Sequence, residues 1–123
     1  MHVLIDTSVR IDHLRSSDSL VFDLLQAGHV VTHEFVIGEL ALGNLARRAE
    51  ILDLMRALPR APTATLNETL ICISRHELTG RGIGYIDAHL LTSAALSPNL
   101  RLLTRDRRLR SAAGELHLEF NAS

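Results

Sequence analysis

The pattern of hydrophobic and polar positions predicts short buried strands separated by longer helices. Apolar runs with β-branched members predict strands at residues 3–5, 29–32 and 101–104, and an alternating run predicts a final edge strand at 116–120. Strands that alternate with helices along a chain usually form a parallel sheet that is buried on both faces. We therefore expect an α/β fold with a mainly parallel central sheet and helices on both faces.

The longer stretches have the apolar spacing or the boundary residues of helices. These stretches are residues 8–15, 18–27, 34–43, 45–58, 68–79, 85–96 and 106–113. In the second of them, Leu20, Leu24 and Ala27 form the expected buried stripe. Gly28 is expected to end that helix, and Asn67 is expected to cap the N-terminus of a later one.

The composition is that of one globular domain. The chain is 46% hydrophobic and 22% charged, and no repeat or linker divides it, so we expect a single domain over residues 1–123. No apolar run is long enough for a membrane span or a signal peptide, which predicts a soluble cytoplasmic protein. The single cysteine, Cys72, excludes an internal disulfide and a cysteine zinc cage, and we expect it to be buried.

The charged residues exclude several kinds of chemistry. Thirteen basic and fourteen acidic residues give a formal net charge of −1, so no overall positive charge attracts nucleic acid or an anionic membrane. All thirteen basic residues are arginine. Because lysine is absent, the chain has no P-loop lysine, no Schiff-base lysine and no lysine general base.

Two acidic residues follow predicted strands. Asp6 comes directly after the first strand, and Asp106 comes after the strand at 101–104. In open α/β sheets, ligands bind outside the carboxyl ends of the strands, which favours a site role. The same positions also suit helix N-caps, so both interpretations remain open for each residue.

Two further acids interrupt the apolar faces of predicted helices. Glu39 has Val36 and Leu40 among its helical neighbours, and Asp87 lies next to Leu91 on its helix face. A buried carboxylate costs several kcal/mol unless it is paired, protonated or bound to a metal. A site role is therefore favoured, although Asp87 also lies in a first helical turn, where capping is the alternative.

If the four acids converge on one pocket, they need a cation. Carboxylate oxygens favour Mg²⁺ or Mn²⁺, ions that activate water and stabilise the oxygens of a phosphodiester during in-line displacement. Glu34 is expected to be structural, because it lies in a first helical turn where the dipole favours a negative charge. His29 and His33 are four residues apart but straddle a strand and a turn, so we do not expect them to bind zinc.

The residues around these acids resemble those of PIN-domain proteins of the VapC toxin type. The matching stretches are VLIDTS at 3–8, FVIGEL at 35–40 with Gly43, GYIDAHLL at 84–91 and LTRD at 103–106. Their order, spacing and total length carry the resemblance, which covers nearly all of the chain.

The resemblance implies a Mg²⁺-dependent endoribonuclease that cuts structured RNA such as tRNA or rRNA, with Mn²⁺ able to substitute. It implies that Asp6 and Asp87 bind the metal, while Glu39 and Asp106 act at the same site directly or through water. Three hydroxyl residues would position acids, water or phosphate: Thr7, Ser8 and Thr104. Some relatives carry a further acid just after the last one, where this chain has arginines.

The resemblance also implies partners. One is a second copy of the chain in a homodimer. The other is a VapB-type antitoxin whose C-terminal segment covers the active-site groove. The chain would contact DNA only indirectly, through this antitoxin. The apolar residues of the first half are more numerous than one face of each helix requires, which agrees with a groove for an amphipathic helix. These residues are Leu20, Val21, Leu24, Leu25, Leu42, Leu45, Ile51, Leu52, Leu54 and Met55.

Arginines near the last acid are candidates for contacts with RNA phosphates. Arg105 is the best placed, between Thr104 and Asp106, and Arg81 and Arg108 are further candidates. The alternative for the run after Asp106 is a solvated helix face. Aromatic residues make up only 3% of the chain, so base stacking is expected to be a small part of recognition.

Other functions are less consistent with these residues. A phosphotransfer or phosphatase domain would have a second carboxylate beside Asp6 and a lysine further on, but Thr7 and Ser8 follow Asp6 and lysine is absent. A catalytically inactive PIN-like binding module would not need all four acids. A housekeeping RNA-processing nuclease without an antitoxin is the remaining alternative, which a neighbouring antitoxin gene would exclude.

Overall fold

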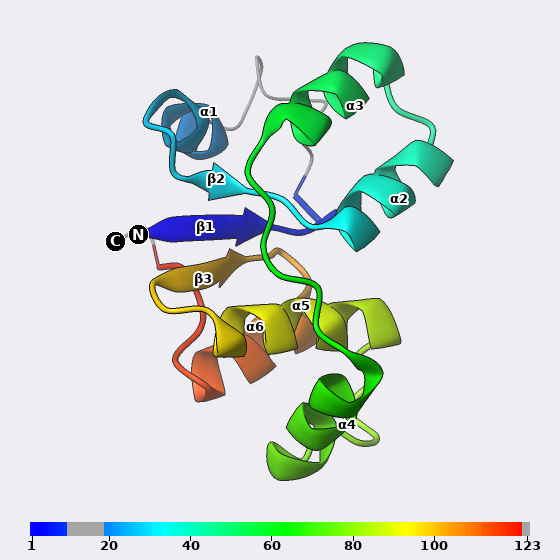
Figure 1. Ribbon diagram of the computed structural model, residues 1–123, viewed down its shortest axis with the longest axis vertical. Coiled ribbons are helices and arrows are strands. Elements are labelled where there is room, and N and C mark those ends of the chain that lie inside the picture. The colour runs from blue at the N-terminus through cyan, green and yellow to red at the C-terminus, as the bar shows by residue number, and fades with distance from the viewer. Residues whose placement is uncertain (10–18, 122–123) are drawn as a thin grey trace.

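The strands form one parallel sheet. The computed structural model describes residues 1–9 and 19–121, and its strands are β1 (His2–Ile5), β2 (Val30–Val31) and β3 (Leu100–Leu103). They lie in the order β2-β1-β3, with parallel pairing on both sides of β1. Their arrowheads point the same way in Figure 1, so their carboxyl ends meet at one edge of the sheet. The predicted parallel sheet is confirmed.

The central strand explains where a site can form. Val3, Leu4 and Ile5 are at most 1% exposed, because neighbouring strands and helices cover β1 on all sides. From β1 the chain moves to β2 on one side and later returns to β3 on the other. Strands whose connections leave in opposite directions form a crevice outside their carboxyl ends, where open α/β sheets bind ligands. That crevice lies after Ile5 and after Leu103.

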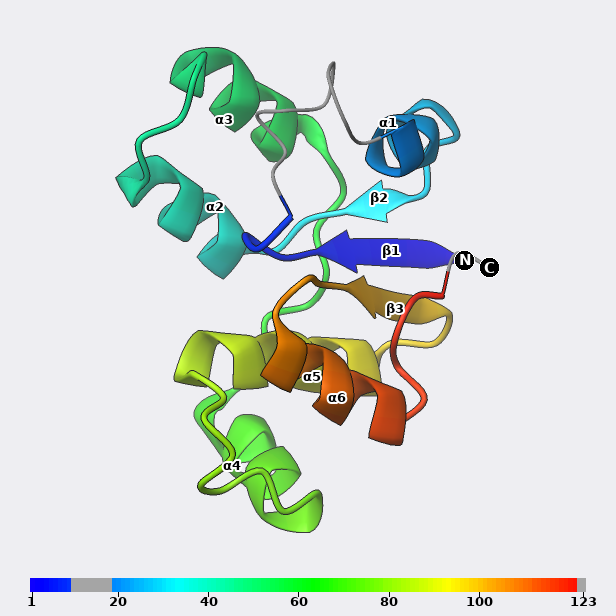
Figure 2. The same ribbon diagram turned by 180° about the vertical axis from the view of Figure 1, so that it is seen from behind.

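Helices flank the sheet on both sides. They are α1 (Ser19–Gln26), α2 (Glu34–Leu42), α3 (Arg48–Ala57), α4 (Leu66–Arg75), α5 (Tyr85–Leu96) and α6 (Arg107–Glu115). The first three lie on the β2 side and the last three on the β3 side (Figure 1). Helix α5 is in front of α6 in Figure 1 and behind it in Figure 2, so α5 and α6 lie on opposite faces of the sheet.

Helix α5 is the most buried helix. Seven consecutive residues, 88–94, are buried, so the helix has no solvent face along its middle. Its predicted bounds are confirmed: Gly84 stands at the N-cap and Ser97 at the C-cap. This burial holds the first turn of α5 firmly at the carboxyl edge of the sheet.

Several predicted boundaries are wrong for local reasons. Asn67 does not cap α4, because Thr65 and Glu68 form a capping box two residues earlier. Helix α3 begins three residues later than predicted, because Arg47 has a left-handed φ of 53° that a continuous helix cannot contain. Helix α1 ends at Gln26, so Ala27 lies beyond it and is exposed, and the buried residues of the helix include Val21 and Leu24.

The predicted final strand at 116–120 is also wrong. His117 has a φ of 58°, which interrupts an extended run. Only one bridge forms, between Leu102 and Glu119, although the backbones of Leu118 and Phe120 bond to Leu102. The helix predicted at 8–15 lies outside the described residues, apart from its first two positions.

None of the helices within residues 1–9 and 19–121 is long and apolar enough to cross a membrane. Cys72 is buried on α4 with a free thiol, as predicted.

Candidate active site

Asp6 is held by two hydroxyl groups at the end of β1. Its Oδ1 accepts hydrogen bonds from the Oγ of Ser8 at 2.6 Å and from the Ser8 backbone N–H at 3.3 Å. Its Oδ2 accepts a bond of 2.7 Å from the Oγ1 of Thr104, which follows β3. Asp6 is only 3% exposed, and burial raises its pKa although these hydrogen bonds act in the opposite direction. The end of β1 and the end of β3 are thus tied through one carboxylate.

The same two hydroxyls hold the segment that carries Asp106. The Ser8 Oγ accepts a 2.7 Å bond from the Arg105 backbone N–H and a 3.2 Å bond from the Asp106 N–H. The Thr104 Oγ1 accepts from the Asp106 N–H at 3.0 Å. The side chain of Thr7 is half-buried, and in the described part of the chain it makes no hydrogen bond to these acids. Ser8 and Thr104 therefore organise the crevice, and Thr7 does not share in this network.

Asp106 is also a helix cap. Its Oδ1 accepts from the backbone N–H groups of Arg108 and Leu109, both at 3.0 Å, and so caps α6. The capping interpretation is correct, yet it does not remove Asp106 from the site. Its negative charge raises the pKa of both Asp6 and Asp87. One carboxylate oxygen holds the helix, and the side chain still belongs to the acid cluster.

Asp87 shows that four carboxylates come together. It lies half-buried in the first turn of α5, and its pKa is raised to about 6. Burial is the largest cause, followed by the negative charges of Asp6, Asp106 and Glu39. The structure thus brings the other three predicted acids within electrostatic range of Asp87. We call Asp6, Glu39, Asp87 and Asp106 the acid cluster.

Glu39 reaches the acid cluster from α2. It is half-buried beside the two buried residues of that helix, Val36 and Leu40. Its carboxylate makes no hydrogen bond or ion pair within the described residues. Glu34 behaves as predicted for a structural residue: it is exposed in the first turn of α2, and it accepts a 3.0 Å bond from Thr63.

The donor chemistry of the acid cluster fits a hard divalent cation. Among residues 1–9 and 19–121, no three His, Cys, Asp or Glu side chains already surround a common metal position. The cluster is therefore an open arrangement and not a closed cage. Mg²⁺ suits such a site, since proteins commonly bind it through one or two carboxylates while it keeps several waters. A bound cation would relieve the repulsion between Asp87 and the neighbouring negative charges.

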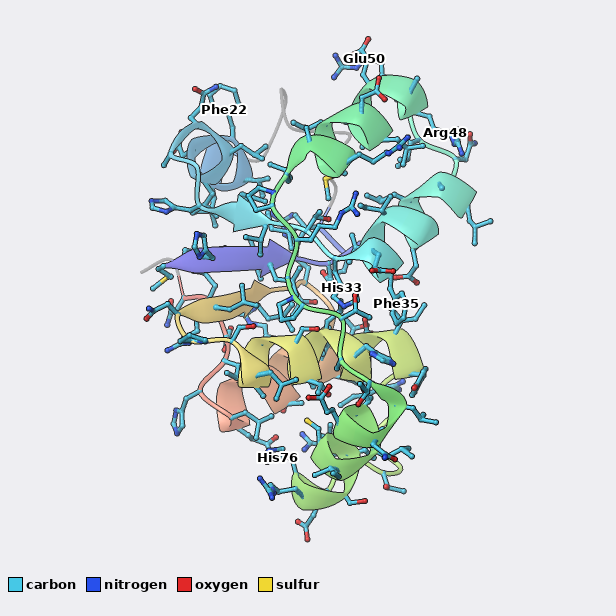
Figure 3. The ribbon with its side chains drawn as sticks, in the orientation of Figure 1. Phe22, His33, Phe35, Arg48, Glu50 and His76 are labelled. Carbon is cyan, nitrogen blue, oxygen red and sulfur yellow. The ribbon has the colours of Figure 1, made fainter. Side chains whose placement is uncertain are left out.

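An aromatic chain lies beside the acid cluster, and sequence reasoning missed it. Ring centroids are 5.0 Å apart for His33 and Phe35, 4.8 Å for Phe35 and His89, and 4.7 Å for His89 and Tyr85, all edge to face. Figure 3 shows His33 and Phe35 between α2 and α5. The chain of rings joins the helices that carry Glu39 and Asp87, and i+4 spacing of Tyr85 and His89 was its only sequence signal.

His33 has a structural role, and its ring makes a different contact from that of His29. The Nδ1 of His33 accepts from the Phe35 N–H at 3.0 Å and caps α2, whereas His29 is exposed and contacts the Met1 carbonyl. Burial lowers the pKa of His33.

The candidate arginines occupy different environments. The guanidinium of Arg81 pairs with both carboxylate oxygens of Glu115. Arg108 is exposed and lies against Gly82. Arg105 is exposed, with its backbone held by Ser8.

The core accounts for most of the apolar residues of the first half. Val21, Leu24, Ile51 and Met55 are buried, and most of the others are partly buried against them. Two remain exposed: Leu42, at 91%, and Leu54, at 36%. The predicted apolar surplus is therefore small.

Comparisons with known proteins agree on the family. A family model of the PIN domain matches residues 3–115. Ribonuclease VapC32 of Mycobacterium tuberculosis, in strains CDC 1551 / Oshkosh and ATCC 25618 / H37Rv, is 45% identical over 113 residues, covering 92% of this chain and 91% of the relative. The crystal structure of PAE2754 from Pyrobaculum aerophilum matches with a TM-score of 0.59 and 20% identity, covering 91% of this chain and 86% of that one. The latter similarity supports the fold alone.

Proposed function

The chain belongs to the PIN-domain family, and within it to the VapC type. From this premise we propose that it is an endoribonuclease that acts as the toxin of a type II toxin–antitoxin pair. The observation that supports the proposal is that the negative charges of Asp6, Asp106 and Glu39 all act on the carboxylate of Asp87. Four carboxylates without a cation repel one another, and such a cluster is suited to metal-assisted hydrolysis of a phosphodiester.

Asp6 and Asp87 are the residues that would hold Mg²⁺, with Mn²⁺ as a substitute. Both are the more constrained acids: Asp6 is buried in a hydroxyl network, and Asp87 is fixed by a buried helix. Glu39 and Asp106 would complete the site directly or through water. When bound, the ion would supply Lewis-acid stabilisation of phosphate oxygens and a lowered pKa of water.

The protein groups have separable roles in this proposal. Ser8 and Thr104 hold the carboxylate of Asp6 and the backbone N–H of Asp106. The Oδ1 atom of Asp106 accepts hydrogen bonds from the N-terminus of α6, so Oδ2 is the oxygen that would interact with the metal or its water. Glu39, with no hydrogen bond inside the described part of the chain, is the carboxylate most available to orient a water molecule and accept its proton.

We propose structured RNA, of the tRNA or rRNA class, as the substrate. Arginine guanidinium groups would contact its phosphates, because their planar forks match phosphate oxygens. Arg105 and Arg108 are exposed beside Asp106 and suit this role. Arg81 is already paired with Glu115 and suits it less.

The proposed partners are a VapB-type antitoxin and a second copy of the chain, acting in the cytoplasm. The exposed Leu42 at the end of α2, together with Leu54 on α3, supports an apolar contact for the antitoxin on this side of the sheet. DNA would be reached only through the antitoxin.

The test is cleavage of total RNA by the purified, antitoxin-free chain in Mg²⁺ and in EDTA. We expect discrete fragments in Mg²⁺, none in EDTA, and recovery when Mg²⁺ or Mn²⁺ is restored. Cleavage that persists in EDTA would contradict a metal-dependent site, and intact RNA under all conditions would favour an inactive binding module.

A further inference from the structure

A positively charged hollow lies between helix α6 and the glycine-rich loop at 80–84, and two of its lining arginines directly follow Asp106. It has a volume of about 460 Å³ and is lined by Arg81, Arg107, Arg108 and Ser111. We propose that this arginine hollow is a subsite for a backbone phosphate of the RNA, adjacent to the phosphodiester that is cleaved. The inference rests on the proposed ribonuclease function and adds to it the place where the substrate is held.

Arg81 is the tether of this hollow. Its guanidinium makes two bonds to the Glu115 carboxylate, one of 3.2 Å and one of 2.5 Å, and the pairing raises the pKa of Arg81 and lowers that of Glu115. The pair joins the glycine-rich loop to the last turn of α6. Its positive charge is balanced within the protein, so Arg81 shapes the hollow and does not act as its phosphate ligand.

Arg107 and Arg108 carry the unbalanced charge. Both are exposed in the first turn of α6, and neither has a carboxylate partner within residues 1–9 and 19–121. Ser111 places a hydroxyl one turn further along α6, in the lining of the same hollow. Two guanidinium groups and a hydroxyl are hydrogen-bond donors that suit the oxygens of a phosphodiester.

Gly82 makes room for Arg108. It has a φ of +74°, and a Cβ built on it would stand 2.6 Å from Nη1 and 2.9 Å from Cζ of Arg108. A side chain at this position would strain the loop and displace the guanidinium. Glycine is therefore needed for the arginine to lie across the loop and line the hollow.

The place of the hollow favours RNA over an acidic protein segment. Arg107 and Arg108 directly follow Asp106, and the loop directly precedes the helix that carries Asp87. Figure 2 shows α6 in front of α5, with both helices on the β3 side. A strand whose scissile phosphate reaches the acid cluster carries further phosphates on either side. Because the acids repel those phosphates and the net charge is −1, a nearby cationic subsite is needed to hold them.

The experiment measures binding of a fluorescein-labelled RNA by anisotropy from 50 to 300 mM KCl. All proteins are full-length and carry Asp87→Asn so that the RNA stays intact. We expect Arg107→Ala combined with Arg108→Ala to raise the Kd roughly tenfold or more and to reduce the slope of log Kd against log salt by about 1–2. Arg56→Ala, an exposed arginine on α3 across the sheet, is the matched control and should change the Kd less than twofold.

A double-mutant cycle tests the role of Gly82. Gly82→Ala should weaken RNA binding when Arg108 is present and have little effect when Arg108 is already alanine. If Gly82→Ala fails to fold, as circular dichroism would reveal, the arginine variants still decide the matter.

The subsite would be overturned if the double arginine variant left the slope of log Kd against log salt unchanged. It would also be overturned if that variant and Arg56→Ala lost equal RNA affinity. A third contradicting outcome is an acidic peptide that binds through Arg108 more tightly than RNA does. Failure of the proposed function would look different, because RNA would then remain uncut by the unsubstituted chain in Mg²⁺. The arginine hollow can therefore fail while the ribonuclease proposal stands.

Discussion

The acid cluster has two halves that are held in different ways. Asp6 and Asp106, at the ends of β1 and β3, are fixed by a hydrogen-bond network through Ser8 and Thr104. Glu39 and Asp87 project from helices, and in the described residues their carboxylates have no comparable hydrogen bonds. The strand half is positioned by specific bonds, whereas the helix half is positioned by packing and stays in electrostatic repulsion.

This difference separates stability from function. Removing a hydroxyl from the strand half leaves buried polar groups without partners and should destabilise the fold. Removing a charge from the helix half relieves repulsion and should stabilise the metal-free protein while abolishing activity. Functional sites often keep such unfavourable charges because the ligand needs them.

The largest expected effect is the loss of cleavage in Asp87→Asn. Asparagine keeps the shape of the side chain but removes the charge, so the rate of RNA cleavage in Mg²⁺ should fall by a factor of about 10² or more. Initial rates on a fixed RNA measure this, with Asp53→Asn on the exposed face of α3 as the control. Full activity in Asp87→Asn would remove this residue from the site.

Ser8→Ala should be the most destabilising change in the strand half. It removes the donor to Asp6 and the acceptor of two backbone N–H groups, so we expect the free energy of unfolding to fall by about 1–3 kcal/mol. Urea denaturation measures it, and Ser74→Ala at an exposed position of α4 should change it by less than about 0.5 kcal/mol. Equal effects would mean that the network does not order the strand half.

The stability of Asp87→Asn relative to the parent should depend on pH in EDTA. The pKa of Asp87 is about 6 in the fold and 3.8 as the reference value, so the folded state binds more protons between these values. Ionisation of Asp87 therefore lowers the stability of the parent as the pH rises from about 4 to 6, and the variant lacks this contribution.

After allowance for the partial exposure of Asp87, the variant should be more stable by about 1–2 kcal/mol at pH 7.5 and equal to the parent near pH 4. Urea denaturation at pH 4, 5, 6 and 7.5 gives the curve. A difference that is constant with pH would show that the pKa of Asp87 is not raised in the folded protein.

Two glutamates of α2 allow a comparison within one helix, and it includes the smallest expected effect, the stability change in Glu34→Gln. Glu39→Gln should lower cleavage strongly, because it removes a member of the acid cluster. Glu34→Gln, on the same helix, should leave cleavage unchanged and lower the free energy of unfolding by only about 0.3–1 kcal/mol through loss of a favourable dipole interaction. Similar cleavage rates in the two variants would contradict the role of Glu39.

Much of this arrangement could be predicted from local sequence patterns. The bounds of α5 followed from its apolar run and from the residues at its ends, Gly84 and Ser97. A site role could be predicted for Asp87 and Glu39 because each interrupts an apolar helix face. The electrostatic interaction of Asp87 with Glu39 and with further acids agrees with this prediction. Such signals work because burial and periodicity are read over a few neighbouring residues.

The rest depended on contacts between distant parts of the chain. Ser8 and Thr104 are 96 positions apart in the sequence, and no local pattern indicates that both hydroxyls bond to Asp6. The pairing of Arg81 with Glu115 changed the role expected for that arginine in the same way. The wrong strand at 116–120 came from alternation, which does not show the left-handed backbone at His117.

The most direct test of the account is thermal unfolding with and without Mg²⁺, because the helix half should need a cation. The parent should gain about 1.4 kcal/mol when Mg²⁺ is at ten times its Kd, seen as a rise in Tm, and Glu34→Gln should gain the same. Asp87→Asn should begin with a higher Tm in EDTA and gain little from Mg²⁺. Equal gains in the parent and Asp87→Asn, or none in the parent, would contradict a cation site at the acid cluster.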